Sequence, residues 1–502
     1  MTFVLEQVNR FVWGVPALFL ILGVGLYLSI RTGFAQFRLL PRALRLFIGR
    51  FTGRQSNRDG ISSYRALCTA LAATVGTGNL AGVAGAIAIG GPGSIFWMWI
   101  CAFLGMITKF AEATLAIRYR NRNTDGEWVG GPMYMIYNGM GSRWSWLAGI
   151  YCFFGVIAAF GVGNATQINA VIGGVNSIVS SIGGQVSIHL NLSIGIIFAI
   201  LILLILLGGA SRIGKIAENI VPFASVFYLL LGAIVLIVRA SSVPNAFSMI
   251  FQGAFSPRAV TGGMIGSSIQ ALRVGASRGV FTNEAGMGTA SIAHGSAQVD
   301  HPVEQGLMGI MEVFIDTIVI CTMTALVILC SGVPIPYGND VGIILTSDAL
   351  ASVYGSWIHI PITLALCCFA IATVLGWGLY GARCAQFLFG ERIWKYFVYL
   401  QAVTVVIGAV LETKIVWILA ETVNGLMAIP NLIVLTVLSP ELIRLVKEYR
   451  IIYGRYSACG GTYENFNQCK SLRTVTYAKI SPSCGSGRKR RKKDLSSEYW
   501  TA

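Results

Sequence analysis

The chain has 502 residues, of which 55% are hydrophobic and only 12% are charged, and its formal net charge is +16. Soluble globular domains carry about 25% charged residues, so this composition excludes an ordinary soluble domain. Apolar stretches long enough to cross a bilayer as helices, about 20 residues each, recur along most of the sequence.

Taken in chain order, the apolar stretches predict an all-α multi-pass membrane protein with about eleven spans. The first is not expected to be a cleaved signal peptide, because Glu6 offsets Arg10 before it and Arg31 follows it where small residues would be needed. The predicted spans are 11–30, 62–91, 94–118, 146–171, 191–209, 214–238, 262–282, 301–331, 356–388, 394–411 and 415–437.

The second span is interrupted by polar and flexible residues. Between Ala72 and Gly82 it contains three glycines together with Thr74, Thr77 and Asn79. Broken helix is tolerated at membrane depth only where it lines a cavity or is buried in protein, and such breaks mark transporter binding sites. The alternative is that the glycines only allow close helix packing. The hydroxyl and amide oxygens favour a binding site.

The third and fourth spans carry further polar side chains. Lys109 and Glu112 are three residues apart on the third span and are close enough on a helix to pair. The fourth span adds Asn164 and Gln167, amides that would face the bundle or each other.

The seventh span contains a second glycine-rich stretch, from residue 261 to residue 279. We predict a helix break near Arg273 and Gly275, where free amides and the helix dipole would favour an anion such as a carboxylate. The two predicted breaks are five helices apart, so they would begin two five-helix halves of opposite orientation. This is the arrangement of an inverted repeat with one extra N-terminal helix and two discontinuous helices.

The eighth and ninth spans complete the candidate polar residues. Glu312 and Asp316 are four residues apart, hence on one face of a helix, where they could carry protons, bind a cation or pair with Arg273. Thr373 and Trp377 have the same spacing. Thr373 would supply an oxygen, and Trp377 either limits the size of the substrate or is ordinary packing.

Basic residues are concentrated in alternate loops, which predicts the orientation. The loops at 172–190 and 332–355 contain no Lys or Arg, whereas the loop after the first span contains many. The N-terminus is therefore expected outside and the C-terminus in the cytoplasm. The loops predicted to be cytoplasmic contain Arg38, Arg42, Arg45, Arg50, Arg54, Arg58, Arg65, Arg118, Arg120, Arg122, Arg143, Arg212, Lys215, Arg392 and Lys395.

The sequence predicts two domains, a transmembrane transporter domain at 1–440 and a basic, disordered cytoplasmic tail at 441–502. The tail contains the basic run 488–493. Such a run can bind nucleic acid, but beside a membrane it favours contact with anionic lipid, so we expect no nucleic-acid partner. Scattered cysteines and only four histidines predict no metal centre other than sodium, and we expect no cofactor.

Several long motifs resemble those of the alanine or glycine:cation symporters, also called sodium:alanine symporters. The resemblance implies the leucine-transporter (LeuT) fold within the amino acid-polyamine-organocation superfamily, in a bacterial or archaeal plasma membrane. It also implies uptake of alanine or glycine coupled to sodium, with protons as the alternative coupling ion. The motifs are at 74–83, 130–134, 278–288, 314–317 and 321–322.

The resemblance also implies a set of binding residues. The substrate carboxylate would bind backbone amides of Gly76, Thr77 and Gly78 and of the second break at Ala271, Leu272 and Gly275. The amino group and side chain of the substrate would lie among Asn79, Gln167, Thr373 and Trp377. Sodium would bind carbonyl or side-chain oxygens of Ala72, Thr74, Val75, Asn79 and Thr373.

Two other classes of function remain open from the sequence. The breaks could form the carbonyl filter of an ion channel, although channels usually repeat one loop and these two breaks differ. Glu312 and Asp316 could serve as acid and base of a membrane-embedded enzyme, although no nucleophile or metal site accompanies them. The sequence thus favours a non-enzymatic, sodium-coupled transporter working by alternating access.

Overall fold

The computed structural model describes residues 15–51, 61–181, 183–261, 267–339, 342–411 and 413–458, together with residues 7 and 263. The chain divides into two compact units, residues 1–446 and 447–502. All the predicted binding residues belong to the first unit. Within the second unit, residues 447–458 continue the last helix, and the predicted lipid-binding run 488–493 lies outside the described residues.

The first half of the chain contains a short leading helix, a bent span and several long helices. In order, these are α2 (Val15–Thr32), α3 (Ala35–Arg38), α4 (Leu40–Phe51), β1 (Ile61–Ser62), α5 (Ser63–Thr74), η1 (Gly78–Gly82), α6 (Val83–Gly90), α7 (Ser94–Tyr119), β2 (Asn121–Arg122), β3 (Trp128–Val129), α8 (Pro132–Tyr134), η2 (Met135–Met140), η3 (Ser142–Trp144), α9 (Ser145–Phe160), η4 (Gly161–Ala165), α10 (Thr166–Ser181), α11 (Ile188–Leu206) and α12 (Gly209–Val238).

The second half is also helical in the described residues, apart from one two-residue strand. Its elements are η5 (Ala240–Ser242), α13 (Val243–Phe255), α14 (Pro257–Thr261), α15 (Ser268–Asn283), α16 (Thr289–His294), β4 (Ala297–Gln298), α17 (Pro302–Val313), η6 (Phe314–Cys321), α18 (Thr322–Ser331), α19 (Ile344–Tyr354), η7 (Ser356–Ile358), α20 (His359–Phe389), η8 (Glu391–Ile393), α21 (Trp394–Gly408), α22 (Thr413–Val437) and α23 (Ser439–Ala458).

Helices occupy the ranges that the sequence predicts as spans. Among the described residues, six helices are long and apolar enough to cross a membrane, and up to eight if each bent pair is one span. The helical multi-pass architecture is therefore confirmed, whereas the count of about eleven spans stays a prediction. The structure adds helices α13, α14 and α19 within stretches expected to be loops.

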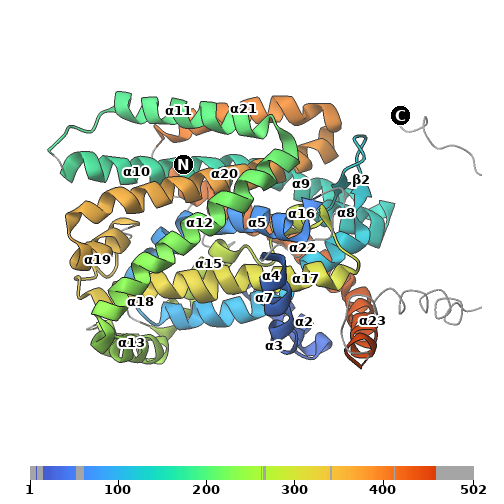
Figure 1. Cartoon of the computed structure of the whole chain (residues 1–502), viewed down its shortest axis with the longest axis horizontal. Helices are drawn as coiled ribbons and strands as arrows, with labels where there is room; N and C mark the ends of the chain where they lie inside the picture. The colour runs from blue at the N-terminus through green and yellow to red at the C-terminus, as the bar shows by residue number, and fades with distance from the viewer. Residues whose placement is uncertain are drawn as a thin grey trace, which may run out of the picture. The chain divides into compact units, whose positions relative to one another are not determined.

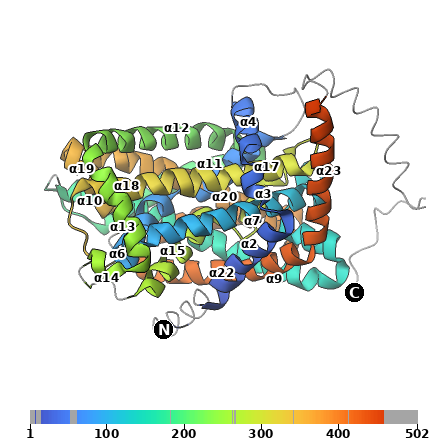
Figure 2. The ribbon, with the colours of Figure 1, turned by 90° about the horizontal axis from the view of Figure 1, so that it is seen from below.

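Burial separates central helices from peripheral ones. In α7, 83% of the apolar window is buried, whereas in α11 the buried share is 17%. Helix α17 packs along α7 at the centre (Figure 1, Figure 2), and α11 packs beside α21 although the two are far apart in sequence (Figure 1). The exposed aliphatic side chains of α11, including Ile197 and Leu204, are suited to face lipid acyl chains.

The beginning of the predicted tail is helical. Helix α23 extends from Ser439 to Ala458, so the expectation of disorder from residue 441 onward is wrong for residues 441–458. Ser-Pro at its start and an acidic residue, Glu441, in its first turn are favourable at a helix N-terminus, which explains why a helix forms here.

Candidate functional site

The second predicted span is broken where the sequence indicates. Helix α5 ends at Thr74, Val75 is extended with ψ 98°, and the helix resumes at Gly78. The two halves, Ser63–Thr74 and Gly78–Gly90, are bent by 52°. This confirms a discontinuous helix at the position of the glycine-rich motif.

Asn79 replaces a helical hydrogen bond inside this first break. The Gly76 amide donates to Asn79 Oδ1 at 2.8 Å. In an uninterrupted helix that amide would donate to the carbonyl of Ala72, four residues earlier. The break therefore leaves the Ala72 carbonyl available to another partner, as a cation site at the end of a half-helix requires.

Asp316 holds the nitrogen of the Asn79 side-chain amide in place. Asn79 Nδ2 donates to Asp316 Oδ1 at 2.6 Å and to the Asp316 carbonyl at 3.2 Å, and it also contacts Cys321 Sγ at 3.3 Å. Asp316 Oδ2 accepts from Thr317 Oγ1 at 2.8 Å. Both Asn79 and Asp316 are fully buried. Segment η6 thus braces the first break, and it sets the orientation of Asn79.

Buried oxygens without partners lie at the first break, and those of Gln167 and Thr373 are beside Gly76. The side-chain oxygens Oγ1 of Thr77, Oε1 of Gln167 and Oγ1 of Thr373 accept or donate no hydrogen bond among the described residues. A β-carbon placed on Gly76 would lie 2.6 Å from Thr373 Oγ1 and 3.4 Å from Gln167 Oε1. Buried polar atoms normally have partners, so a cluster of orphaned oxygens at a broken helix indicates a polar ligand or cation.

The second break is not where the sequence analysis placed it. Helix α15 continues without interruption from Ser268 to Asn283, through Leu272 and Gly275. Gly275 serves close packing, because a β-carbon there would lie 2.2 Å from the Ser94 carbonyl oxygen of α7. The predicted break, and amides freed at Ala271, Leu272 and Gly275 to bind the substrate carboxylate, are therefore wrong.

The interruption of this span lies between α15 and α16, at residues 284–288. Glu284, Gly286 and Gly288 have φ values of 53°, 93° and 78°. Left-handed backbone is accessible to glycine but costly for other residues, so this turn ends the helix. The signal was present in the sequence as two glycines spaced by one residue after Asn283-Glu284, within a motif that was noted only for its resemblance.

Buried carboxylates stabilise the second break. Glu112 Oε1 accepts from the amides of Gly286 (2.9 Å) and Gly288 (3.1 Å) and from Asn431 Nδ2 (2.7 Å). Glu284 accepts from Thr289 Oγ1 at 2.6 Å and from Trp377 Nε1 at 2.8 Å. The Lys109–Glu112 pair that the spacing allowed does not form, because Glu112 instead accepts hydrogen bonds from the amides that the turn leaves without helical partners, and Lys109 pairs with Glu312.

The charged residues pair differently from the prediction. Arg273 is exposed on α15 and is not the partner of Glu312 or Asp316. Glu312 accepts from Lys109 Nζ and from His294 Nε2, both at 2.9 Å. The actual partner of Glu312 could not be predicted from the sequence, because Lys109 lies 203 positions before it.

The two breaks approach each other closely. A β-carbon on Gly78 would lie 3.0 Å from Thr282 Cγ2 and 3.7 Å from Phe281 Cδ1, directly before the second break. Trp377 is fully buried against Gly163 and hydrogen-bonded to Glu284. Gly76, Gln167 and Thr373 are thus brought together, and Trp377 is placed at the second break.

Two of the predicted ligands have local roles in the structure. Thr74 Oγ1 donates to the Ala70 carbonyl of its own helix at 3.3 Å. Val75 donates its amide to the Leu71 carbonyl at 2.7 Å, which leaves its own carbonyl at the start of the break. Of the side-chain oxygens named from the sequence as cation ligands, Thr74 Oγ1 and Asn79 Oδ1 have protein partners, and Thr373 Oγ1 has none among the described residues.

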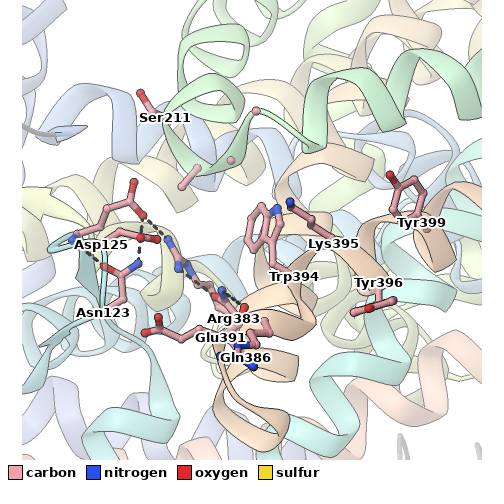
Figure 3. Close-up of a pocket in the computed structure, with 15 residues that line it drawn as sticks. Asn123, Asp125, Ser211, Arg383, Gln386, Glu391, Trp394, Lys395, Tyr396 and Tyr399 are labelled. Atoms are coloured by element: carbon pink, nitrogen blue, oxygen red, sulfur yellow. Dashed lines mark hydrogen bonds and ion pairs between the residues drawn. The ribbon is translucent and has the colours of Figure 1, made fainter. Parts of the chain in front are cut away.

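A surface pocket of about 630 Å³ lies elsewhere in the structure (Figure 3). It is lined by the β2–β3 hairpin, the turn between α11 and α12, and the junction of α20 with α21. There Arg383 pairs with Glu127 at 2.9 Å and donates to Gln386 at 3.0 Å. No residue of either break lines this pocket, so it is distinct from the candidate binding site.

Comparison with solved structures identifies the fold. The crystal structure of MhsT in complex with L-phenylalanine matches with a TM-score of 0.54 and 14% sequence identity, covering 78% of this chain and 99% of that one. The chain therefore has a leucine-transporter-like fold, as the resemblance implies.

Comparison of sequences identifies the family. The sodium/alanine symporter AgcS of Methanococcus maripaludis is 42% identical over 454 residues, which are 89% of this chain and 97% of the relative. The amino-acid carrier protein AlsT of Bacillus subtilis is 37% identical over 445 residues, 88% and 90% of the two chains. Residues 1–453 match the sodium:alanine symporter family along their whole length, and the chain belongs to that family.

Proposed function

We propose that this protein takes up alanine or glycine by coupling its entry to sodium. Membership in the sodium:alanine symporter family makes the chain a transporter rather than an enzyme. The observation that carries the proposal is the cluster of orphaned buried oxygens of Gln167 and Thr373 beside the unwound backbone at Gly76. A small zwitterion and a hard cation both suit such a site.

The substrate carboxylate is assigned to the first break. The backbone amides of Thr77 and Gly78 lie at the start of the second half-helix, where the dipole favours negative charge, whereas the Gly76 amide, which the sequence also offered to the carboxylate, already donates to Asn79 Oδ1. Gln167 and Thr373 then lie beside the amino group. Thr373 Oγ1 and Gln167 Oε1 would lie only 2.6 Å and 3.4 Å from a β-carbon on Gly76, and this closeness is our reason to favour a small substrate.

Sodium is assigned to the end of the first half-helix, α5. The Ala72 and Val75 carbonyls are released by the break, and Asn79 and Thr373 contribute side-chain oxygens. Oxygen-only coordination suits sodium, and moving one such ion inward is worth about 2.3 kcal/mol per 100 mV of membrane potential. Because sodium and substrate bind at the same break, each of them stabilises the same conformation of the protein. This shared preference is the basis of coupling.

The membrane arrangement follows from the same proposal. About eleven spans form two inverted five-helix halves after one leading helix, in the plasma membrane of a bacterium or archaeon. The N-terminus lies outside, and the C-terminus lies in the cytoplasm. The transport domain comprises residues 1–440, and the basic run 488–493 contacts anionic lipid.

Uptake of isotopically labelled alanine and glycine into proteoliposomes tests the function. We expect accumulation above the external concentration with an inward sodium gradient, and none when potassium replaces sodium. Accumulation driven by a pH gradient without sodium would establish proton coupling instead. A channel would let the amino acid equilibrate without concentrating it, and an enzyme would change it chemically.

A further inference from the structure

Two half-helices, one from each interrupted span, are joined at the same end of the protein. Strand β1, directly before α5, pairs in parallel with β4, which follows α16 by two residues. Ile61 lies opposite Ala297 and Ser62 opposite Gln298. A ladder of two residues is too short to be stable alone, so neighbouring side chains must contribute to the junction.

Gln305, at the start of α17, contacts both half-helices. Its Oε1 accepts from the Ser63 hydroxyl, and its Nε2 donates to the Ser63 carbonyl at 3.4 Å. The same Nε2 donates to His294 Nδ1 at 2.7 Å. Ser63 is the first residue of α5 and His294 the last of α16, so one fully buried amide binds the ends of both.

The partners of Gln305 determine the direction of the hydrogen bonds. A carbonyl can only accept, so the amide nitrogen faces the Ser63 carbonyl and the His294 ring. His294 Nδ1 is then the acceptor, and the ring proton is on Nε2, which donates to Glu312 Oε2 at 2.9 Å. Glu312 in turn accepts from Lys109 Nζ at 2.9 Å. A buried chain of hydrogen bonds therefore runs from α5 through α16 and α17 to α7.

We propose that Gln305 is a positioning residue of the transport cycle, which holds the start of α5 against α16 and releases it when the site opens to the cytoplasm. This inference rests on the proposed function and its orientation. The unwound residues 75–77 are the hinge about which α5 can rotate. Opening by rotation of α5 requires breaking the Ser63–Gln305 contacts.

The buried amide contributes more to this junction than the ion pair nearby. Arg65 on α5 pairs with Glu218 on α12 at 2.9 Å, but the two side chains are 30% and 24% exposed. A partly exposed pair is screened by water and contributes little. Gln305 is inaccessible to water, so each hydrogen bond that it loses leaves a buried polar atom without a partner.

Glutamine has a chemical property at this position that a carboxylate lacks. An ionised carboxylate here could accept from the Ser63 hydroxyl but could donate neither to the Ser63 carbonyl nor to His294 Nδ1, whereas the glutamine amide does all three.

Cys68, one turn into α5 and buried, is a natural reporter of α5 movement. We would measure maleimide labelling of Cys68 by peptide mass spectrometry in the full-length protein in proteoliposomes, alongside alanine uptake. Gln305→Leu should raise the labelling rate and the sodium KM by about fivefold or more, because losing buried hydrogen bonds shifts the conformational equilibrium. Gln401→Leu, at a buried glutamine that contacts Ala159 instead, should change neither.

A milder variant completes the experiment. Ser63→Ala removes only one donor and should give a smaller rise in labelling, and it replaces Gln305→Leu if that variant does not fold.

The inference and the proposed function can fail separately. Unchanged Cys68 labelling and sodium KM in Gln305→Leu or Ser63→Ala would overturn the positioning role. Absence of sodium-driven alanine accumulation in the wild-type protein would instead overturn the proposed function, while the difference in Cys68 labelling between wild type and Gln305→Leu would still test the contact between α5 and Gln305.

Discussion

Gly76 lies directly against Thr373, because a β-carbon on Gly76 would be 2.6 Å from the Thr373 hydroxyl oxygen. The unwound backbone of one span and the hydroxyl of another thus share a single small space, and Gln167 Oε1 borders it. This contact makes the glycine, and the size of the residue facing it, testable determinants of binding.

Gly76→Ala should abolish sodium-dependent uptake. The added methyl group either displaces Thr373 or distorts the break, and such overpacking costs about 1–3 kcal/mol of stability. Gly173→Ala is the matched control, because a β-carbon there meets nothing within 4 Å. Adding Thr373→Ala to Gly76→Ala should restore thermal stability but not uptake, and independent, additive effects in this double-mutant cycle would argue against the contact.

Thr373→Ala should weaken both sodium coupling and substrate binding while leaving thermal stability nearly unchanged. Its hydroxyl oxygen is buried and has no protein partner among the described residues, so folding loses no hydrogen bond, whereas a bound ligand would. The apparent affinity should fall about tenfold. Sodium-dependent alanine uptake at limiting sodium measures the effect, and unchanged uptake would remove Thr373 from the site.

Thr324→Ala is the control for that variant. The Thr324 hydroxyl is bonded to Tyr228 at 2.6 Å, so its removal should lower the melting temperature without changing the sodium KM. A changed sodium KM with unchanged stability in Thr373→Ala, beside lowered stability with unchanged sodium KM in Thr324→Ala, would distinguish a ligand oxygen from a structural one.

Asp316→Asn should impair folding and sodium affinity more than it alters the pH dependence of uptake. The carboxylate accepts from Asn79 and Thr317, and an amide can supply only one of these two acceptor oxygens. Asn79 would then lose the orientation in which it accepts from Gly76. Expression level, melting temperature and uptake from about pH 5 to about pH 8 check this prediction.

A well-folded Asp316→Asn protein with normal sodium affinity that has lost only its pH dependence would contradict that prediction and favour proton symport. Asp348→Asn, at an exposed position on α19, controls for the loss of a negative charge and should behave as wild type.

The first break could be predicted from the sequence, and the second could not be placed correctly. Between Ala72 and Gly82, glycines alternate with side chains that carry hydroxyl or amide oxygens, and this pattern predicts a broken helix. Gly275 offers the same local signal, yet it lies in continuous helix because α7 crosses there. A glycine needed for contact with another helix and a glycine needed for a turn look alike until the neighbouring element is known.

Ion-pair partners that lie far apart along the chain could not be predicted from the sequence either. Local spacing allowed a pair of Lys109 with Glu112, and Arg273 was a candidate partner of Glu312 or Asp316, but the structure pairs Lys109 with Glu312 across 203 residues. Spacing along one helix identifies side chains on a common face, whereas the identity of the partner depends on which helices pack together. The helical multi-pass character needed only apolar length and was predictable for that reason, whereas the count of eleven spans and the inverted repeat stay predictions.

The last prediction concerns Trp377 and the size of the substrate. Its indole lies one turn from Thr373, is fully buried against Gly163, and donates to Glu284 at the second break. If the ring closes the site behind the substrate side chain, Trp377→Ala should admit valine- or leucine-sized amino acids and weaken alanine binding. Each additional methylene accommodated is worth about 0.8 kcal/mol, so the preference could invert.

The structure adds a second consequence of removing this indole. Trp377→Ala leaves a large cavity and takes a donor from Glu284, so the melting temperature should fall by an amount corresponding to about 3–5 kcal/mol. Trp377→Phe keeps most of the ring and removes only the hydrogen bond, which separates the two effects. A stable Trp377→Phe protein with wild-type substrate range, beside a folded Trp377→Ala protein that transports valine, would assign size selection to the volume of the ring. If the folded Trp377→Ala protein still transports only alanine and glycine, another side chain must limit the substrate, and Phe281, beside Gly78, becomes the residue to test.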